Sequence, residues 1–136
     1  MSNSSRRFDL SVLPDSLAIV RLSADATLPS WGTQGAFFSV TRTDDELSIV
    51  CIARQVPPGV AAETGWRALK VAGPFALSEV GVLATLATPL AKASVSLFVI
   101  STFDTDYLLV AEKQLRAAIA ALTDAGHRVQ KTSAAS

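Results

Sequence analysis

The sequence is short of several residue types, and each shortage excludes a class of protein. One cysteine, Cys51, and one histidine, His127, occur among 136 residues. A single cysteine cannot form an internal disulfide, and one histidine without a second ligand at metal spacing is no zinc signature. We therefore interpret Cys51, inside the strand-like run LSIVCIA, as a small buried hydrophobe, and His127 as a strand-edge or helix C-cap residue.

Charge of one sign is also lacking. Twelve basic and twelve acidic residues cancel to a formal net charge of 0, and no stretch concentrates either sign. Nucleic-acid binding needs a basic surface, so the composition predicts no nucleic-acid partner. Apolar runs are interrupted before the roughly 20 residues of a membrane helix, and the starting residues MSNSSRR lead into no signal-peptide core. We expect a cytoplasmic protein with no membrane partner.

Catalytic and cofactor motifs are missing from the sequence too. There is no phosphate-binding loop, no nucleophile elbow and no zinc-ligand spacing. The sequence therefore predicts a protein that is not an enzyme and that uses no metal or cofactor. One enzymatic alternative stays open, a small hydrolase or isomerase in which Asp104 and His127 meet in a cleft.

What is present is abundant core material and a repeated hairpin pattern. Hydrophobic residues make up 49% of the chain. Residues 95–110, VSLFVISTFDTDYLLV, predict a strand, an acidic turn at 102–106 and a second strand, because β-branched and aromatic runs flank turn formers. Residues 38–50, FSVTRTDDELSIV, show the same pattern, which indicates a duplicated supersecondary unit. A shift of sixty positions aligns Phe38 with Phe98, Thr41 with Ser101, Asp44 with Asp104, Glu46 with Asp106 and Val50 with Val110.

The first half of the chain predicts a small unit made mostly of strands. We expect strands at 8–13 and 17–22 that pair as a hairpin, a loop at 23–35 and then the first copy of the repeated hairpin. Residues 54–65, with the Pro-Pro-Gly sequence at 57–59, read as the connection between halves. The predicted domains are residues 8–60 and 66–131.

The second half predicts strand, helix, strand, strand, helix, strand. We expect a strand at 66–72, a helix of about four turns from Ser78 that Pro89 kinks or ends late, the second hairpin, a helix capped by Gly126, and a strand at 127–131. The apolar stripes of the two helices are Val82, Leu83, Leu86, Ala87 and Leu90, and Leu115, Ala118, Ile119 and Leu122. This order predicts an α+β, ferredoxin-like βαββαβ unit with both helices on one face of a four-stranded antiparallel sheet. The first half is then a degenerate, mostly β copy.

These stretches resemble a known family. GPFALSEVGVLATLATPLAKASVSLFVISTFDTDYLLV, followed by LRAAIAALTDAGHRV, resembles an ACT domain, and FFSVTRTDDELSIVC resembles the truncated ACT-like unit that precedes it in a bacterial group. These small paired-ACT proteins are similar to the regulatory ACT domains of aspartate kinases and to the CASTOR arginine sensors. The resemblance implies a homodimeric regulatory module that binds a small molecule, usually an amino acid, where ACT units meet.

The resemblance also implies where ligand contacts lie: the loop and helix start after the first strand, and the end of the second strand. The matching residues are Phe75, Ser78, Glu79, Val80, Gly81, Val82, Leu83, Ser101, Thr102, Phe103, Asp104 and Asp106. From the residues alone, the free N–H groups of a helix start suit an α-carboxylate, and Glu79, Asp104 and Asp106 suit an α-ammonium or a basic side chain. The same acids are equally compatible with a first-turn carboxylate and with solvated turn formers.

Two functions follow as hypotheses. The first is an amino-acid sensor whose ligand changes the arrangement of subunits or of a partner protein. The alternative is a protein–protein interaction module with a vestigial pocket. In the sixty-residue alignment Thr102 and Phe103 differ from Arg42 and Thr43, so we expect them to be specialised if only the second unit binds ligand.

Overall fold

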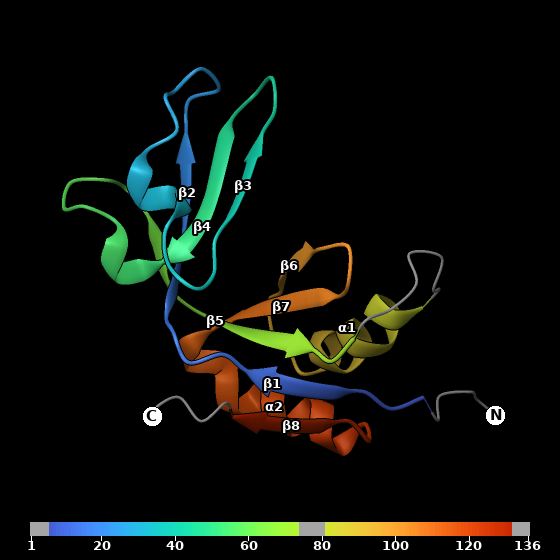
Figure 1. The fold of residues 1–136 in the computed structure, drawn as a ribbon. Coiled ribbons are helices and arrows are strands. Elements are labelled where there is room, and N and C mark those ends of the chain that lie inside the picture. The colour runs from blue at the N-terminus through green and yellow to red at the C-terminus, as the bar shows by residue number, and fades with distance from the viewer. Residues whose placement is uncertain (1–5, 74–80, 132–136) are drawn as a thin grey trace. The chain divides into compact units, whose positions relative to one another are not determined.

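A computed structural model describes residues 6–73 and 81–131 of the chain. The chain divides into two compact units. The larger comprises residues 1–14 and 67–136, and the smaller comprises Asp15–Trp66. Figure 1 shows the elements in chain order. No helix within the described ranges has both the length and the apolar character needed to cross a membrane.

The larger unit contains the predicted order of strands and helices. Its elements are β1 (Asp9–Val12), the later part of β5 (Glu63–Val71), α1 (Val82–Lys92), β6 (Phe98–Ser101), β7 (Asp106–Ala111), the short 3-10 turn η3 (Glu112–Gln114), α2 (Leu115–Asp124) and β8 (Arg128–Lys131). The strand order is β6-β7-β5-β1-β8, with β1 antiparallel to β5 and parallel to β8. The ferredoxin-like prediction is confirmed, but β1 adds a strand between β5 and β8. The predicted purely antiparallel four-stranded sheet is therefore wrong in this detail.

The predicted hairpin of 8–13 with 17–22 is also wrong, because β1 pairs on both edges with other strands. Leu13 N–H donates to the Ala68 carbonyl at 2.9 Å, and Arg128 N–H donates to the Phe8 carbonyl at 2.9 Å. Residues expected in the first domain thus lie in the sheet of the larger unit. Burial explains this placement, since the alternate side chains of β1 are fully enclosed under the helices of that unit.

Both helices of the larger unit pack on one face of its sheet and share one core with it (Figure 1). The helix residues in this core recur at helical spacing, as predicted, and the strand residues alternate. The core contains Val82, Leu86 and Leu90 of α1, Ala118 and Leu122 of α2, Leu10 and Val12 of β1, Leu69 and Val71 of β5, and Leu108 and Val110 of β7.

Both helices end in the same hydrogen-bonded motif. Gly126, with φ +101°, follows α2, and the next N–H, that of His127, donates to the Leu122 carbonyl at 3.0 Å. This is a Schellman cap, so the prediction that Gly126 ends α2 is confirmed. Ser94, with φ 61°, occupies the same position after α1, where Val95 N–H donates to the Leu90 carbonyl at 3.0 Å. Pro89 is accommodated within the last turn of α1.

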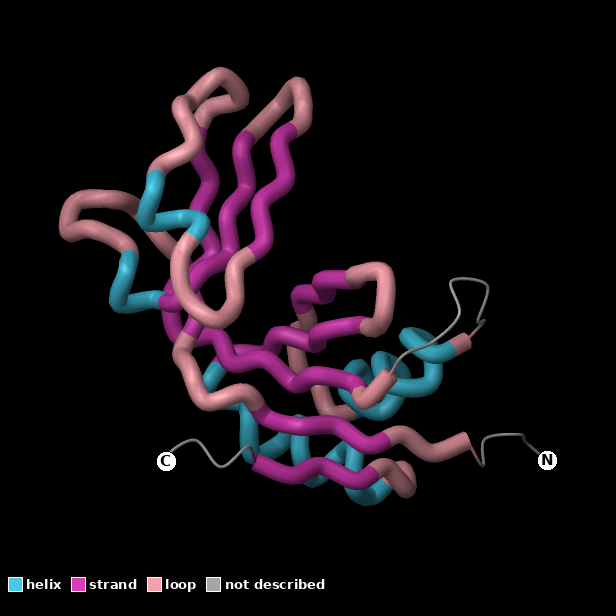
Figure 2. Tube along the Cα trace, viewed as in Figure 1, coloured by secondary structure: helices cyan, strands magenta, loops and turns pink. Residues whose placement is uncertain are grey.

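The smaller unit is mostly β, as predicted. It contains β2 (Leu17–Leu22), η1 (Ser30–Thr33), β3 (Ser39–Arg42), β4 (Leu47–Ile52), η2 (Ala53–Gln55) and the first part of β5, in the strand order β3-β4-β2-β5. Its helical elements are the short 3-10 turns η1 and η2, which are coloured cyan in Figure 2. Its core includes Val20, Leu47, Ile49 and Cys51. Cys51 is buried, as predicted, and burial raises the pKa of its thiol above the ordinary value.

Candidate functional site

The turn between β6 and β7 is fixed by threonine side chains. Thr102 N–H donates to the Thr105 carbonyl at 2.8 Å, and Thr105 N–H donates to Thr102 Oγ1 at 3.3 Å. Thr105 is buried, and its hydroxyl donates to the Val71 carbonyl at 2.6 Å. This bond joins the turn to the end of β5. Sequence reasoning missed Thr105 because a threonine between two acids looks like an ordinary turn residue.

The predicted site residues of this turn differ in how far their side chains are exposed and free to contact a ligand. Phe103 is 77% exposed at the tip, and Asp104 beside it is exposed. Asp106 is half-buried, and its Oδ1 accepts a hydrogen bond from the Ser101 hydroxyl at 2.5 Å. The carboxylate with more freedom to meet a ligand is therefore that of Asp104.

The start of α1 supplies backbone donors. The N-cap is Gly81, with φ 85°, and not Ser78 as predicted, because α1 begins at Val82. The first N–H with an intrahelical acceptor is that of Thr85, which donates to the Gly81 carbonyl at 2.9 Å. The N–H groups of residues 82–84 thus have no acceptor within the helix. A side-chain β-carbon built on Gly81 would meet none of the described residues within 4 Å.

The remaining predicted residues near α1 divide into two groups. Val82 is 7% exposed and packs in the core, so only its backbone can face a ligand, whereas Leu83 is 39% exposed. Phe75, Ser78, Glu79 and Val80 lie outside the described residues. Their proposed roles stay predictions.

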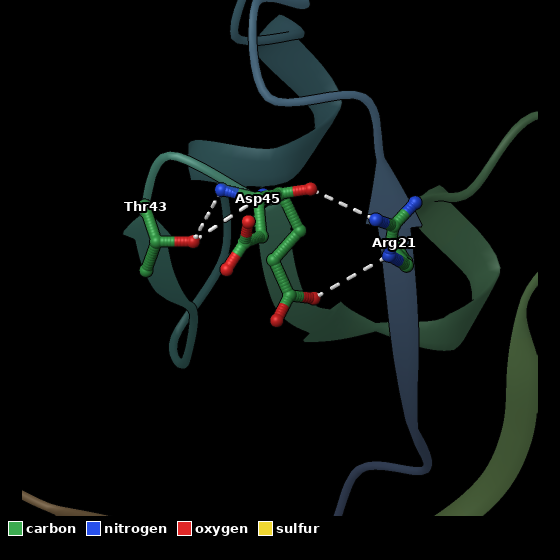
Figure 3. A network of polar contacts seen from close by, with 4 residues as sticks. Arg21, Thr43 and Asp45 are labelled. Atoms are coloured by element: carbon green, nitrogen blue, oxygen red, sulfur yellow. Dashed lines mark hydrogen bonds and ion pairs between the residues drawn. The ribbon is translucent and has the colours of Figure 1, made fainter.

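The turn between β3 and β4 in the smaller unit is also held by a threonine, and an arginine adds to its contacts (Figure 3). Thr43 Oγ1 accepts hydrogen bonds from the N–H groups of Asp45 and Glu46 at 3.1 Å and 3.3 Å. The guanidinium of Arg21, reaching from β2, donates to the Asp45 carbonyl at 2.8 Å and lies 3.8 Å from Glu46 Oε1. The acidic turn of the first copy is thus partly neutralised by an arginine of its own unit.

The two hairpins are related by a shift of 59 positions, so the predicted shift of sixty is wrong by one. β6 starts at 98 where β3 starts at 39, β7 starts at 106 where β4 starts at 47, and η3 starts at 112 where η2 starts at 53. Thr43 therefore matches Thr102 and makes the same turn contacts. The acids misled the alignment because exposed turn acids are not held in register by packing. Within the turn residues 102–105, the positions that differ from the first copy are Phe103, which matches Asp44, and Thr105, which matches Glu46.

A groove of about 970 Å³ lies between α1 and α2, with His127 among its lining residues. His127 is 4% exposed, and its Nδ1 accepts a hydrogen bond from Phe8 N–H at 3.1 Å. Burial first, and the charge of Arg7 second, lower the pKa of His127 below its ordinary value. Asp104 does not line this groove, so the hydrolase alternative gains no support.

We expect His127→Ala to lower the free energy of unfolding by about 1–3 kcal/mol, because the buried Phe8 N–H loses its acceptor. His127→Asn is the matched control, since its Oδ1 can accept the same bond. Urea titrations of the three proteins at pH 7.5 check the difference. Equal stability of the alanine variant and the wild type would contradict the role of this bond.

The pH dependence of the same bond has a defined sign. The folded pKa of His127 is lowered, so below about pH 6.5 the unfolded chain binds the proton before the folded protein does. Stability is therefore complete above that pH and is lost as the pH falls through the lowered folded pKa. Arg7 opposes the protonated ring, and Lys92 and Asp124 line the same groove. As the pH falls through this range, the free energy of unfolding of the wild type is expected to decrease relative to that of the His127→Asn variant. Parallel curves of unfolding free energy against pH for the two proteins would contradict this.

The fold and the two turns define an α+β protein in which a ferredoxin-like unit accompanies a smaller β copy. A family model described as ACT domain matches residues 61–124, and a second model, of an N-terminal domain, matches residues 15–59. The chain belongs to the ACT domain family.

Solved structures agree with this family. A protein from Agrobacterium tumefaciens is 41% identical with a TM-score of 0.89, and the match covers 95% of this chain and 96% of that chain. The ligand-free regulatory subunit of aspartate kinase from Thermus thermophilus is 12% identical with a TM-score of 0.58, covering 85% of this chain and 96% of that chain. At the lower identity the likeness is one of fold alone.

Curated relatives include cytosolic arginine sensors for mTORC1, subunit 1. The protein from Bos taurus is 33% identical over 95 residues, which cover 64% of this chain and 29% of that protein. The protein from Homo sapiens is 40% identical over 58 residues, 42% of this chain and 18% of that protein. The chain thus spans less than a third of the length of these relatives. Membership of the family supports a regulatory, ligand-binding role.

Proposed function

We propose that the chain is a regulatory sensor, not an enzyme, that binds an amino acid between the start of α1 and the β6–β7 turn. The observation that carries the proposal is that both places belong to the ACT unit and offer complementary groups. Backbone donors lie at the α1 start, and an exposed carboxylate, that of Asp104, lies in the turn. The names of the curated relatives support a sensor that works in the cytoplasm.

The α1 end of the site suits the α-carboxylate of the ligand. N–H groups without an intrahelical acceptor, together with the positive end of the helix dipole, favour an anion there. Among the described residues, none would contact a β-carbon built on Gly81, so no described side chain crowds this N-cap position. Leu83, partly exposed on the same turn, offers apolar contact to the ligand side chain.

The turn end of the site suits a positively charged group. Asp104 is exposed, whereas Asp106 already accepts the Ser101 hydroxyl. Phe103 adds an apolar ring at a position where the first copy carries Asp44. A ligand with an ammonium or guanidinium group and an aliphatic part fits these neighbours best.

Signalling then follows from linkage. A ligand that binds one arrangement of subunits, or of a partner protein, more tightly than another shifts the population toward the first. The shift cannot exceed the difference in the two binding free energies. The buried hydrogen bond between Thr105 and Val71 connects the turn to β5. Through this bond, ligand contact at the turn can affect the position of β5 in the sheet.

We expect a thermal-unfolding screen of the common amino acids to find a stabilising ligand. At a ligand concentration of about 100 times the dissociation constant, the gain is roughly 2.7 kcal/mol. Asp104→Asn should weaken the binding about tenfold or more, because it removes the carboxylate that pairs with the ligand cation. Asp45→Asn is the matched control, since Asp45 holds the equivalent position in the first hairpin.

Two results would contradict the proposed sensor. One is the absence of a stabilising shift with any amino acid, and the other is equal weakening by the Asp104 and Asp45 variants. The exposure of Phe103 favours the alternative of a protein-interaction module in the first case. That alternative expects assembly to be unchanged when Asp104 and Asp106 are both replaced by alanine.

A further inference from the structure

The groove between α1 and α2 has opposite charges at its two ends. Gln114, just before α2, donates to the Ser94 carbonyl at 3.1 Å and accepts from Ser96 N–H at 3.3 Å. Because residues 94 and 96 follow α1, the end of α1 lies beside the start of α2, and the helices are antiparallel. Lys92, in the last turn of α1, and Asp124, in the last turn of α2, therefore line opposite ends of the groove.

The groove between these charges is lined by small side chains. Its exposed members include Ala84, Thr88, Ala117 and Ala120. Side chains of this size allow another helix pair to approach closely, in the range of about 8–10 Å between axes. Across the described part of the chain, Lys92 and Asp124 have no ion-pair partner. Both charges are thus available to a second molecule.

A buried polar group also opens onto this groove. His127 Nδ1 accepts the Phe8 N–H, which assigns the proton of the neutral ring to Nε2. No atom of residues 6–73 and 81–131 accepts a hydrogen bond from Nε2. Nε2 is also not one of the side-chain polar atoms in these residues that are fully buried without a hydrogen-bond partner. This donor, on a side chain that is 4% exposed and lines the groove, is placed to give a hydrogen bond to an acceptor of a molecule that enters the groove.

We propose that the α1–α2 groove is the docking face for a second copy of this chain, related by a two-fold axis through the middle of the groove. When this axis lies in the interface at a right angle to the line that joins Lys92 and Asp124, Lys92 faces the partner's Asp124 and Asp124 faces the partner's Lys92. The surface is thereby complementary to itself in charge, and its small side chains permit the two copies to approach closely. A partner of one charge sign would instead leave one end of the groove facing a like charge.

This docking face adds to the proposed function, because it is the subunit contact that a ligand-linked rearrangement would change. In that respect the inference rests on the proposed function. The test is made without ligand, so the two proposals fail separately. Loss of the dimer contact with an intact amino-acid response would overturn only this inference. A dimer without any amino-acid response would overturn only the sensor.

The experiment is a charge exchange followed by mass measurement. Light scattering and sedimentation equilibrium of the whole chain should show a dimer. Lys92→Glu and Asp124→Lys each place like charges together twice, so each is expected to weaken the dimer on the order of 10–100-fold. When the two variants are mixed, each contact again pairs an acid with a base, and a mixed dimer should return.

The matched control is Lys113→Glu, which changes the charge equally on η3 but does not line the groove. It should leave the dimer unchanged, and circular dichroism should show that every variant is folded. A monomeric wild type would overturn the proposal. So would single variants that stay dimeric, or folded variants whose mixture stays monomeric.

Discussion

Leu86→Ala is expected to lower the free energy of unfolding by about 2–5 kcal/mol. Leu86 is fully buried in the middle of α1, in the core formed by both helices and the sheet of the larger unit. Truncation removes its transfer free energy and leaves a cavity that the packed strands below can fill only in part. Urea unfolding followed by circular dichroism gives the value directly.

Leu83→Ala is the control for this prediction, because it makes the same chemical change on the same helix. Leu83 is 39% exposed, so its truncation is expected to cost under about 1 kcal/mol. The difference between the variants then measures burial rather than helix propensity. Similar losses for Leu83→Ala and Leu86→Ala would show that α1 does not pack as described.

The contrast between these two leucines shows what local sequence can predict. Apolar residues at helical spacing indicated both helices, and alternating runs indicated the strands, because each pattern reports which face of an element is buried. The position of β1 was not predictable in the same way. Its alternating Leu10 and Val12 fit a hairpin with the next strand as well as a pairing with β5 and β8, and pairing between distant strands leaves no local signal.

The candidate site shows the same division. The sequence of residues 95–110 predicted a hairpin with a polar turn, but the alignment of the two turns was wrong by one residue. The acids that guided the alignment are exposed, whereas the matching contacts are made by Thr43 and Thr102. Thr105 escaped notice because its importance comes from burial and from its bond to Val71, which only the fold brings near.

The repeated unit also has a repeated clamp before each hairpin. In the smaller unit, the side-chain amide of Gln55 donates to the carbonyls of Trp31 and Gln34 at 3.0 Å and 3.1 Å. In the larger unit, the side chain of Gln114 donates to the Ser94 carbonyl at 3.1 Å and accepts from the Ser96 N–H at 3.3 Å. Gly35 and Ser94 are themselves separated by the shift that relates the hairpins, and both have positive φ, 91° and 61°. The clamp thus fixes a left-handed residue at the entrance to each hairpin.

Gly35→Ala is therefore expected to destabilise the protein by about 2–5 kcal/mol. The left-handed backbone costs a residue with a side chain about 1–2 kcal/mol. The added β-carbon would lie 2.5 Å from Gln55 Oε1 and 2.8 Å from Ile52 Cδ1. Relieving this contact means moving Gln55 away from its two carbonyl acceptors or shifting a buried isoleucine, a crowding cost of about 1–3 kcal/mol.

Gly59→Ala separates the two causes. Gly59 has the same φ of +91°, and a β-carbon there would meet nothing within 4 Å. The free energy of unfolding of this variant should fall only by the backbone cost of about 1–2 kcal/mol. The additional loss in Gly35→Ala, measured by urea unfolding, is then the stability held by the Gln55 clamp. Equal losses at both positions would mean that Gln55 and Ile52 yield freely, and that the left-handed residue alone sets the path of the chain into the hairpin.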